Sequence, residues 1–287
     1  MTLFDDDQDT QIRSLIRSCG QQAKQMSAQG LEVFEKAPAD FVTNVDRALD
    51  RQLSAGFAKF FPADGVITEE NSASRQQFQS GNVRLWCIDP IDGTEDFIRQ
   101  QPDYAVMVGL LEKKQPLAGW IYAPEPDVMY YGGRDRGLWK TSGGSTSEPL
   151  AASHPQPPSP NHFRLIVGNK DRENFGAAIA QSIPEVEFVY SLGSFGLKVM
   201  NVIMGQAGLY LYLNGRVKVW DTVAPLALAK VAGLVCCDLD GNELSYASDK
   251  MNLETLAHQQ SIVIGWEPYV ESLLPKIRSV VASVINS

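Results

Sequence analysis

Two carboxylates lie three residues apart in the stretch Trp86-Cys87-Ile88-Asp89-Pro90-Ile91-Asp92-Gly93-Thr94, directly after an apolar run. The proline between Asp89 and Asp92 is incompatible with an ordinary strand or helix interior, so the pattern predicts a buried strand, 84–88, that breaks into a tight turn. Two neighbouring carboxylates repel each other, and a bound cation or a proton must compensate for this. A divalent cation with oxygen ligands is one interpretation. A type I turn is an equally good interpretation of this stretch taken alone.

Two further acids have a similar context. Glu69 follows the apolar run Val66-Ile67-Thr68, and Asp221 follows Val217-Lys218-Val219-Trp220. Carboxylates at the exits of strands can meet at one edge of a sheet even when they are far apart in the sequence. Oxygen ligands without His or Cys suit Mg²⁺, Mn²⁺ or Ca²⁺ and not zinc. The chain also lacks the glycine-rich loop with Lys and Ser/Thr that would indicate a P-loop.

The composition restricts the class of partner. Acidic residues number 34 against 25 Lys plus Arg, a formal net charge of −9, which argues against a nucleic-acid polymer as the ligand. The four cysteines form no C-x-x-C pair and are expected to be small buried hydrophobes in a reduced protein. We expect a soluble, cytoplasmic protein with no membrane contact, because neither a signal peptide nor an apolar run of roughly 20 residues is visible.

The elements that must position these acids follow from hydrophobic periodicity. Two amphipathic helices are expected at 12–26 and from 44 or 46 to 60, with a connector at 36–43 and a polar loop at 71–82. The turn residues that separate the strand-like runs predict antiparallel hairpins in the first half of the chain, whereas strands and helices alternate in the second half. The expected strands are 66–68, 84–88, 104–111, 117–123, 128–132, 137–140, 163–168, 186–190, 208–213, 235–239 and 261–266, and the later helices are 172–182, 197–204, 222–232 and 268 onward.

This pattern predicts a layered α+β protein of two lobes. An N-terminal lobe, 1–145, would carry most of the acids, and a C-terminal lobe, 163–287, would complete the site. The segment 142–161 is rich in Gly, Ser and Pro, and residues 146–162 are expected to be the linker.

Three motifs together resemble the inositol monophosphatase superfamily: Glu69-Glu70, Asp89-Pro90-Ile91-Asp92-Gly93-Thr94, and Trp220-Asp221-Thr222-Val223-Ala224-Pro225. The segment 40–46 extends the resemblance toward the start of the chain. It implies an αβαβα sandwich and a Mg²⁺-dependent, lithium-sensitive phosphomonoesterase that acts on a small molecule. The resemblance also implies two or three metal ions per site, with Mn²⁺ as an alternative to Mg²⁺. A homodimer is compatible with it.

The resemblance also implies roles for individual residues. Glu69, Asp89 and the Ile91 carbonyl would bind a first metal ion, and Asp89, Asp92 and Asp221 a second. Thr94, with Asp46 or Glu69, would orient and deprotonate the attacking water. The backbone amides of Gly93 and Thr94 would face the phosphate, and Glu70 is expected to be a solvated surface carboxylate.

Two segments favour the 3′(2′),5′-bisphosphate nucleotidase branch, which hydrolyses adenosine 3′,5′-bisphosphate to AMP and phosphate. The run from Gly193-Ser194 to Lys198 resembles a segment in which the lysine meets a second phosphate or the ribose, although Lys198 could equally be a solvated helix lysine. The W-D-T-V-A-P string, with 240–242 downstream, is also closer to this branch. The expected substrate-binding residues are Gly93, Thr94, Gly193, Ser194, Lys198 and Asp221.

Two departures favour the alternative, an inositol-1-monophosphatase or another sugar or polyol phosphatase of the superfamily. Gly168-Asn169-Lys170 stands where nucleotidases carry a Ser/Thr-x-Ser-His contact to the nucleotide. Glu95 and Asp96 stand where nucleotidases prefer a basic residue, and acids there would disfavour a second phosphate.

Overall fold

The structure is a computed structural model that describes residues 5–38, 40–155, 162–189 and 193–286. Residues 156–161 of the predicted linker and the end of the predicted strand 186–190 lie outside this range. The chain divides into two compact units. The first comprises Met1–Leu150, Gly193–Leu197 and Val219–Leu228, and the second comprises Ala151–Leu192, Lys198–Lys218 and Ala229–Ser287.

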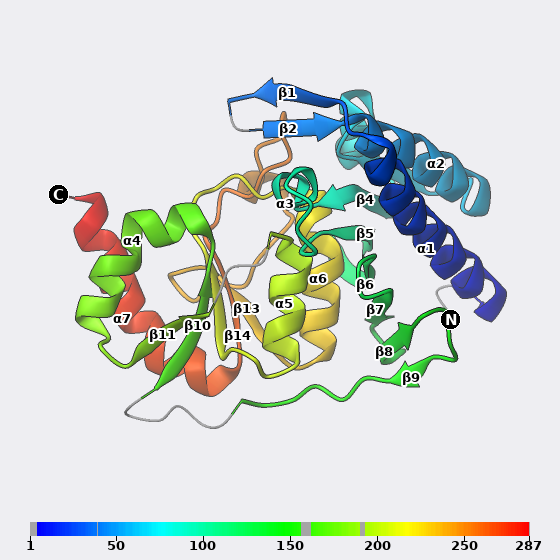
Figure 1. The fold of residues 1–287 in the computed structure, drawn as a ribbon. Helices are drawn as coiled ribbons and strands as arrows, with labels where there is room; N and C mark the ends of the chain where they lie inside the picture. The colour runs from blue at the N-terminus through cyan, green and yellow to red at the C-terminus, as the bar shows by residue number, and fades with distance from the viewer. Residues whose placement is uncertain (1–4, 39, 156–161, 190–192, 287) are drawn as a thin grey trace. The chain divides into compact units, whose positions relative to one another are not determined.

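The first unit is built on a seven-stranded sheet with the order β3-β4-β5-β6-β7-β8-β9 (Figure 1). Only β3 and β4 pair in parallel, and every other neighbouring pair in this sheet is antiparallel, as the hairpin pattern predicts. The strands are β3 Gly65–Thr68, β4 Arg84–Asp92, β5 Ala105–Glu112, β6 Gln115–Ala123, β7 Val128–Gly133, β8 Gly137–Ser142 and β9 Glu148–Pro149.

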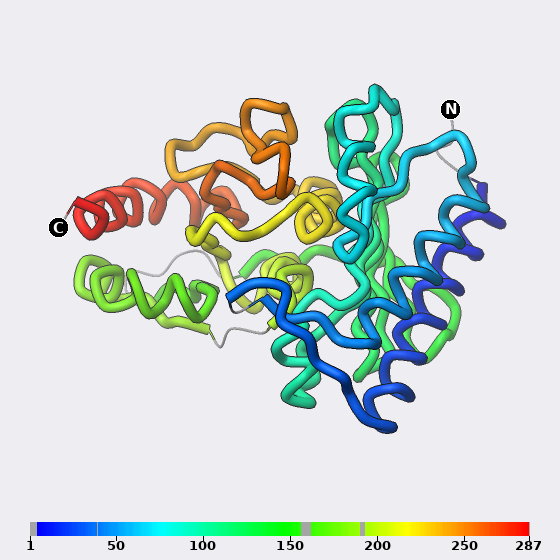
Figure 2. Tube along the Cα trace, turned by 90° about the horizontal axis from the view of Figure 1, so that it is seen from above, coloured from blue at the N-terminus to red at the C-terminus, as the bar shows by residue number. Residues whose placement is uncertain are grey.

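Two long helices, α1 (Asp6–Gln29) and α2 (Asn44–Phe60), lie side by side against this sheet (Figures 1 and 2). Their apolar stripes are buried as the periodicity predicts, and they pack on a sheet core that includes Trp86 and Trp120. Each helix begins with a capping box. In the box of α2, the Thr43 side chain accepts from the backbone N–H groups of Val45 and Asp46, and the Asp46 carboxylate accepts from the Thr43 N–H.

Three segments of this unit differ from the sequence-based expectation. The expected connector is an antiparallel hairpin of β1 (Val33–Ala37) and β2 (Asp40–Thr43), which was missed because all five β1 residues are exposed and show no alternation of apolar and polar positions. The expected polar loop contains a 3₁₀ helix, η1 (Ser72–Gln79). Strand β4 does not end at Ile88 but continues to Asp92 through a register shift between Asp89 and Asp92.

The second unit contains a five-stranded sheet with the order β11-β10-β12-β14-β13, in which β11, β10 and β12 are parallel and β14 is antiparallel to its neighbours. Helices α4 (Asn169–Ser182) and α7 (Glu267–Ile285) lie alongside each other in Figure 1. The strands are β10 Phe163–Val167, β11 Val186–Val189, β12 Leu209–Tyr212, β13 Val235–Cys237 and β14 Ile262–Gly265, with a short η2 at Ser248–Lys250. The α+β fold expected from the sequence is confirmed.

Helices α5 (Phe195–Ile203) and α6 (Val219–Val231) contribute residues to both units. Helix α6 begins three residues before the predicted start, so Asp221 lies in its first turn. None of the helices in the described part of the chain combines the length and the apolar composition that crossing a bilayer requires.

Candidate metal centre

Strand β4 carries Asp89 and Asp92 into the interior of the first unit. Both side chains are buried, and the Ile91 N–H donates to Asp89 Oδ1 at 3.0 Å. In a regular strand, residues three apart point to opposite faces. The register shift between Asp89 and Asp92, which includes Pro90, interrupts this alternation.

Glu69 is positioned by the parallel pairing of β3 with β4. Its backbone N–H donates to the Ile88 carbonyl at 3.1 Å, so Glu69 leaves β3 beside Asp89. Carboxylate oxygens of Glu69, Asp89 and Asp221 lie within 4.8 Å of one another. Acids at the ends of different elements therefore meet at one place, although more than 150 positions separate the first from the last in the sequence.

Asp221 reaches this place because α6 rests directly on the backbone of two strands. Gly109 of β5 and Gly119 of β6 are paired across the sheet. A Cβ on Gly109 would lie 2.6 Å from Ala224 N, and one on Gly119 would lie 2.4 Å from Ala224 O. No side chain larger than hydrogen fits at either position without displacing α6, so both glycines determine where Asp221 lies. These glycines were not singled out from the sequence, in which nothing connects them with Ala224.

The cluster is electrostatically unfavourable as a set of free anions. Burial raises the pKa of Asp89 well above its usual value, and repulsion by Glu69, Asp92 and Asp221 raises it further. Glu70, expected to be a solvated carboxylate, is instead nearly buried, with a side chain only 7% exposed. Burial and the neighbouring Glu69 raise the pKa of Glu70 to about 7. This correction follows from the hairpin β1–β2, which carries a partner for Glu70.

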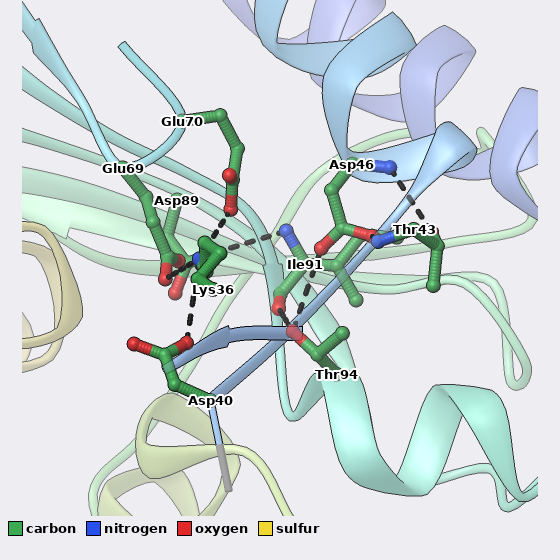
Figure 3. Close-up of polar contacts among 9 residues, drawn as sticks. All are labelled: Lys36, Asp40, Thr43, Asp46, Glu69, Glu70, Asp89, Ile91 and Thr94. Carbon is green, nitrogen blue, oxygen red and sulfur yellow. Dashed lines mark hydrogen bonds and ion pairs between the residues drawn. The ribbon is translucent and has the colours of Figure 1, made fainter. Parts of the chain in front are cut away.

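That partner is Lys36, which the sequence did not single out (Figure 3). Its ammonium lies 2.9 Å from Glu69 Oε1, 2.9 Å from Glu70 Oε1 and 3.5 Å from Asp40 Oδ1. Burial lowers the pKa of Lys36, but attraction by Glu69 and Glu70 outweighs this and raises it above its usual value. A cation of the protein thus already binds at the rim of the carboxylate cluster.

These observations fit a hard metal ion. The converging ligands are carboxylate oxygens without His or Cys, the set that Mg²⁺, Mn²⁺ and Ca²⁺ prefer. The Lys36 ammonium lies against Glu69, and burial together with the neighbouring carboxylates raises the pKa of Asp89, so a bound cation would stabilise the ionised cluster.

Thr94 and Asp46 form a second group beside the cluster (Figure 3). Thr94 Oγ1 lies 3.0 Å from the Ile91 carbonyl oxygen and 3.4 Å from Asp46 Oδ1. The other oxygen of Asp46, Oδ2, accepts from the Thr43 N–H at 2.8 Å and from the Thr43 hydroxyl. Burial raises the pKa of Asp46 to about 6, although the Thr43 hydrogen bonds lower it. The carboxylate that caps α2 therefore presents its second oxygen to Thr94.

Asp92 is oriented by the segment Gly193–Leu197. Asp92 Oδ2 accepts from the Ser194 hydroxyl and, at 2.9 Å, from the Gly196 N–H. Asp92 is not one of the three residues whose oxygens converge within 4.8 Å, although its charge raises the pKa of Asp89. Gly93, with φ of 94°, precedes the short helix α3 (Thr94–Ile98), and a Cβ on it would lie 3.0 Å from Ser194 N.

Lys198 belongs to the second unit and is buried, so the alternative of a solvated helix lysine is wrong. Its ammonium lies 5.9 Å from the centre of the Tyr210 ring, and it acts electrostatically on Asp171, lowering that carboxyl's pKa against the larger effect of burial. Lys170, at the start of α4, is exposed.

Known proteins resemble the chain along most of its length. Residues 6–267 match the inositol monophosphatase family. The 3′(2′),5′-bisphosphate nucleotidase CysQ of Salmonella typhimurium is 30% identical over 241 residues, which are 82% of this chain and 92% of the relative. Inositol monophosphatase 1 of Mus musculus is 25% identical over 246 residues, which are 83% and 85% of the two chains.

Among solved structures, the inositol monophosphatase of Thermotoga maritima superposes with a TM-score of 0.75 at 22% identity, covering 98% of this chain and all of that one. At this identity the match concerns the fold. The family match extends along residues 6–267. The chain belongs to the inositol monophosphatase family and is a metal-dependent phosphoric monoester hydrolase.

Proposed function

We propose that the protein is a Mg²⁺-dependent 3′(2′),5′-bisphosphate nucleotidase that hydrolyses adenosine 3′,5′-bisphosphate to AMP and phosphate. The observation that carries the phosphatase chemistry is the convergence of carboxylate oxygens from Glu69, Asp89 and Asp221 within 4.8 Å. The choice of substrate is supported by the 30% identity to a nucleotidase over 92% of that relative's length. The matching segment from Gly193 to Lys198 supports it as well.

In this proposal, Glu69, Asp89 and the Ile91 carbonyl hold one ion, and Asp89, Asp92 and Asp221 hold a second. Mg²⁺ is proposed because all of these ligands are oxygens, and Mn²⁺ would suit the same set. When bound, such ions neutralise charge on a phosphate and lower the pKa of a coordinated water, which supplies a nucleophile at neutral pH.

The chain's own residues orient the water and take its proton. Thr94 Oγ1 can accept a hydrogen bond from the attacking water while its hydroxyl donates to Asp46 Oδ1, 3.4 Å away. As the proton of the water moves to Thr94 Oγ1, the hydroxyl's own proton would pass to Asp46 Oδ1, because Oδ2 is already occupied by two donors from Thr43. A pKa of about 6 suits a base that works near neutral pH. Asp46 is a better base than Glu69 here, since Glu69 is paired with Lys36.

Substrate binding is proposed to use groups at the start of α3 and at or near the start of α5. The backbone amides of Gly93 and Thr94 would face the scissile phosphate, while Gly193, Ser194 and Asp221 would contact the remainder of the substrate. Lys198 would meet the second phosphate. Lys198 is buried, and it acts electrostatically on the Asp171 carboxyl, whose pKa it lowers.

An inositol-1-monophosphatase is the second candidate. The 25% identity to the mouse inositol monophosphatase extends over 85% of that relative. In addition, Gly168-Asn169-Lys170 replaces the Ser/Thr-x-Ser-His contact that nucleotidases make to the nucleotide. Of these three residues, only the exposed Lys170 could offer a charge in its place.

A substrate panel distinguishes the two candidates. Phosphate release with Mg²⁺ should give a kcat/KM for adenosine 3′,5′-bisphosphate about tenfold or more above that for inositol 1-phosphate, and lithium should inhibit both reactions. The reverse preference would establish the second candidate. Lys198→Ala should reduce kcat/KM for the bisphosphate more than for inositol 1-phosphate, and Lys276→Ala, at an exposed lysine of α7, serves as the matched charge control.

A further inference from the structure

Asp96, in the first turn of α3, contacts the backbone of a segment that is distant in the sequence. A Cβ built on Gly193 would lie 1.8 Å from Asp96 Oδ2 and 2.8 Å from the Asp103 carbonyl oxygen, both closer than real Cβ atoms approach. The carboxylate therefore lies against Gly193, and a larger residue at position 193 would have to displace it.

The other side of the same segment is held equally closely. The Ser194 N–H donates to the Asp103 carbonyl at 2.9 Å, and a Cβ on Gly93 would lie 3.0 Å from Ser194 N. Gly193 and Ser194 thus lie between the start of α3 and the backbone of Asp103. Gly193 has no side chain that could separate its backbone from Asp96 and Asp103.

What this segment does is bind Asp92. The Ser194 hydroxyl and the Gly196 N–H both donate to Asp92 Oδ2. Hydrogen bonds to a carboxylate restrict its rotation, and such partners commonly change metal affinity by about 10–100-fold when they are removed. Any group that fixes Ser194 therefore also fixes Asp92.

We infer that Asp96 is a positioning residue that holds Gly193 and Ser194 where they orient Asp92. The affinity for the ion that Asp92 binds then depends on Asp96, although Asp96 itself binds neither ion nor substrate. This inference rests on the proposed role of Asp92 as a metal ligand. The inference also distinguishes Asp96 from the adjacent Glu95, which is exposed and pairs with Arg99, 3.4 Å away at the end of the same helix.

The test is a double-mutant cycle on ion affinity. Mg²⁺ is titrated calorimetrically into the metal-free full-length protein carrying Asp96→Ala, Ser194→Ala or both, with Glu95→Ala as the matched acidic control. Each single variant of the pair should weaken binding about tenfold, and the double variant should be within about twofold of Ser194→Ala, because both changes act through one contact. Glu95→Ala should stay within about twofold of the wild type.

Asp96→Asn retains an acceptor oxygen of the same shape and should recover most of the affinity. Additive losses in the double variant, or equal effects of Asp96→Ala and Glu95→Ala, would overturn the inference. If Asp96→Ala does not unfold cooperatively on heating, Asp96→Asn replaces it in the comparison. A loss of Mg²⁺ affinity in Asp96→Asn without a loss in Ser194→Ala would then overturn the inference too. If the wild type binds Mg²⁺ but does not hydrolyse bisphosphates, only the proposed substrate is refuted. If the wild type binds no Mg²⁺, both the proposed function and the inferred role of Asp96 are refuted.

Discussion

Replacing Lys36 by methionine should make the metal-free protein bind Mg²⁺ more tightly. The ammonium of Lys36 contacts Glu69 and Glu70 at 2.9 Å and Asp40 at 3.5 Å, and Glu69 is a proposed ligand of the first ion. An incoming ion must break the contact with Glu69 and must approach a positive charge. Methionine keeps the aliphatic stem and removes both obstacles.

The magnitude follows from the contacts that the ion must replace. The Lys36 side chain is 27% exposed, so its ion pairs are stronger than those on an open surface, which contribute about 0.2–1 kcal/mol each. Hydrogen bonds to charged groups contribute about 1.5–3 kcal/mol. Taking about 1–2 kcal/mol for the Glu69 contact, the dissociation constant for Mg²⁺ should fall about 5- to 30-fold.

Calorimetric titration of Mg²⁺ into protein freed of metal by EDTA measures this change. Lys59→Met is the matched control, because Lys59 is an exposed lysine at the end of α2 and its loss changes the net charge equally. The same Lys36 variant should melt at a lower temperature than the wild type without metal, since Glu69 and Glu70 lose their cation. A dissociation constant unchanged within twofold, or an increased one, would refute the competition between Lys36 and the ion.

Three further outcomes are expected. In EDTA, the folded protein should lose stability as pH rises from about 4 to about 6, because burial raises the pKa of Asp46 from 3.8 to about 6 and the folded state binds that proton more tightly. In urea unfolding, Asp46→Asn should remove up to ~3 kcal/mol of this pH-dependent loss, and parallel stability curves of wild type and variant would contradict the prediction. Thr94→Ala should lower kcat by about 10²-fold or more, whereas the kcat of Thr94→Ser, which keeps the hydroxyl, should stay within about tenfold of the wild type. Equal losses of kcat in the two variants would exclude a role of the hydroxyl. Gly119→Ala should weaken Mg²⁺ binding and cost about 1–3 kcal/mol of stability by displacing α6, and wild-type values would show that α6 adapts.

Local patterns in the sequence predicted much of this fold. The stripes of α1 and α2 repeat with helical spacing, and the strands of the first sheet are separated by turn residues, so both were visible in one dimension. The meeting of Glu69 with Asp89 was also predictable, because each acid follows an apolar, strand-like run in the sequence.

Features that depend on contacts across the fold were not predictable in the same way. Lys36 lies in an exposed hairpin without alternation, and only its folded position shows that it faces the acids. Glu70 was expected in solvent for the same reason, since its partner could not be identified. Asp96 and Glu95 are adjacent and chemically alike, and only the approach of Gly193 tells them apart.

The seating of α6 on Gly109 and Gly119 has a consequence for how this enzyme could be altered. At Gly119 the contact is with the backbone of Ala224, and at Gly109 it is with the backbone of Ala224 and the side chain of Val223. A methyl group added at either glycine would therefore move Asp221 relative to Glu69 and Asp89 from a position that is not itself a proposed ligand. Changes at these glycines would alter the space among the proposed ligands while every one of those residues is kept.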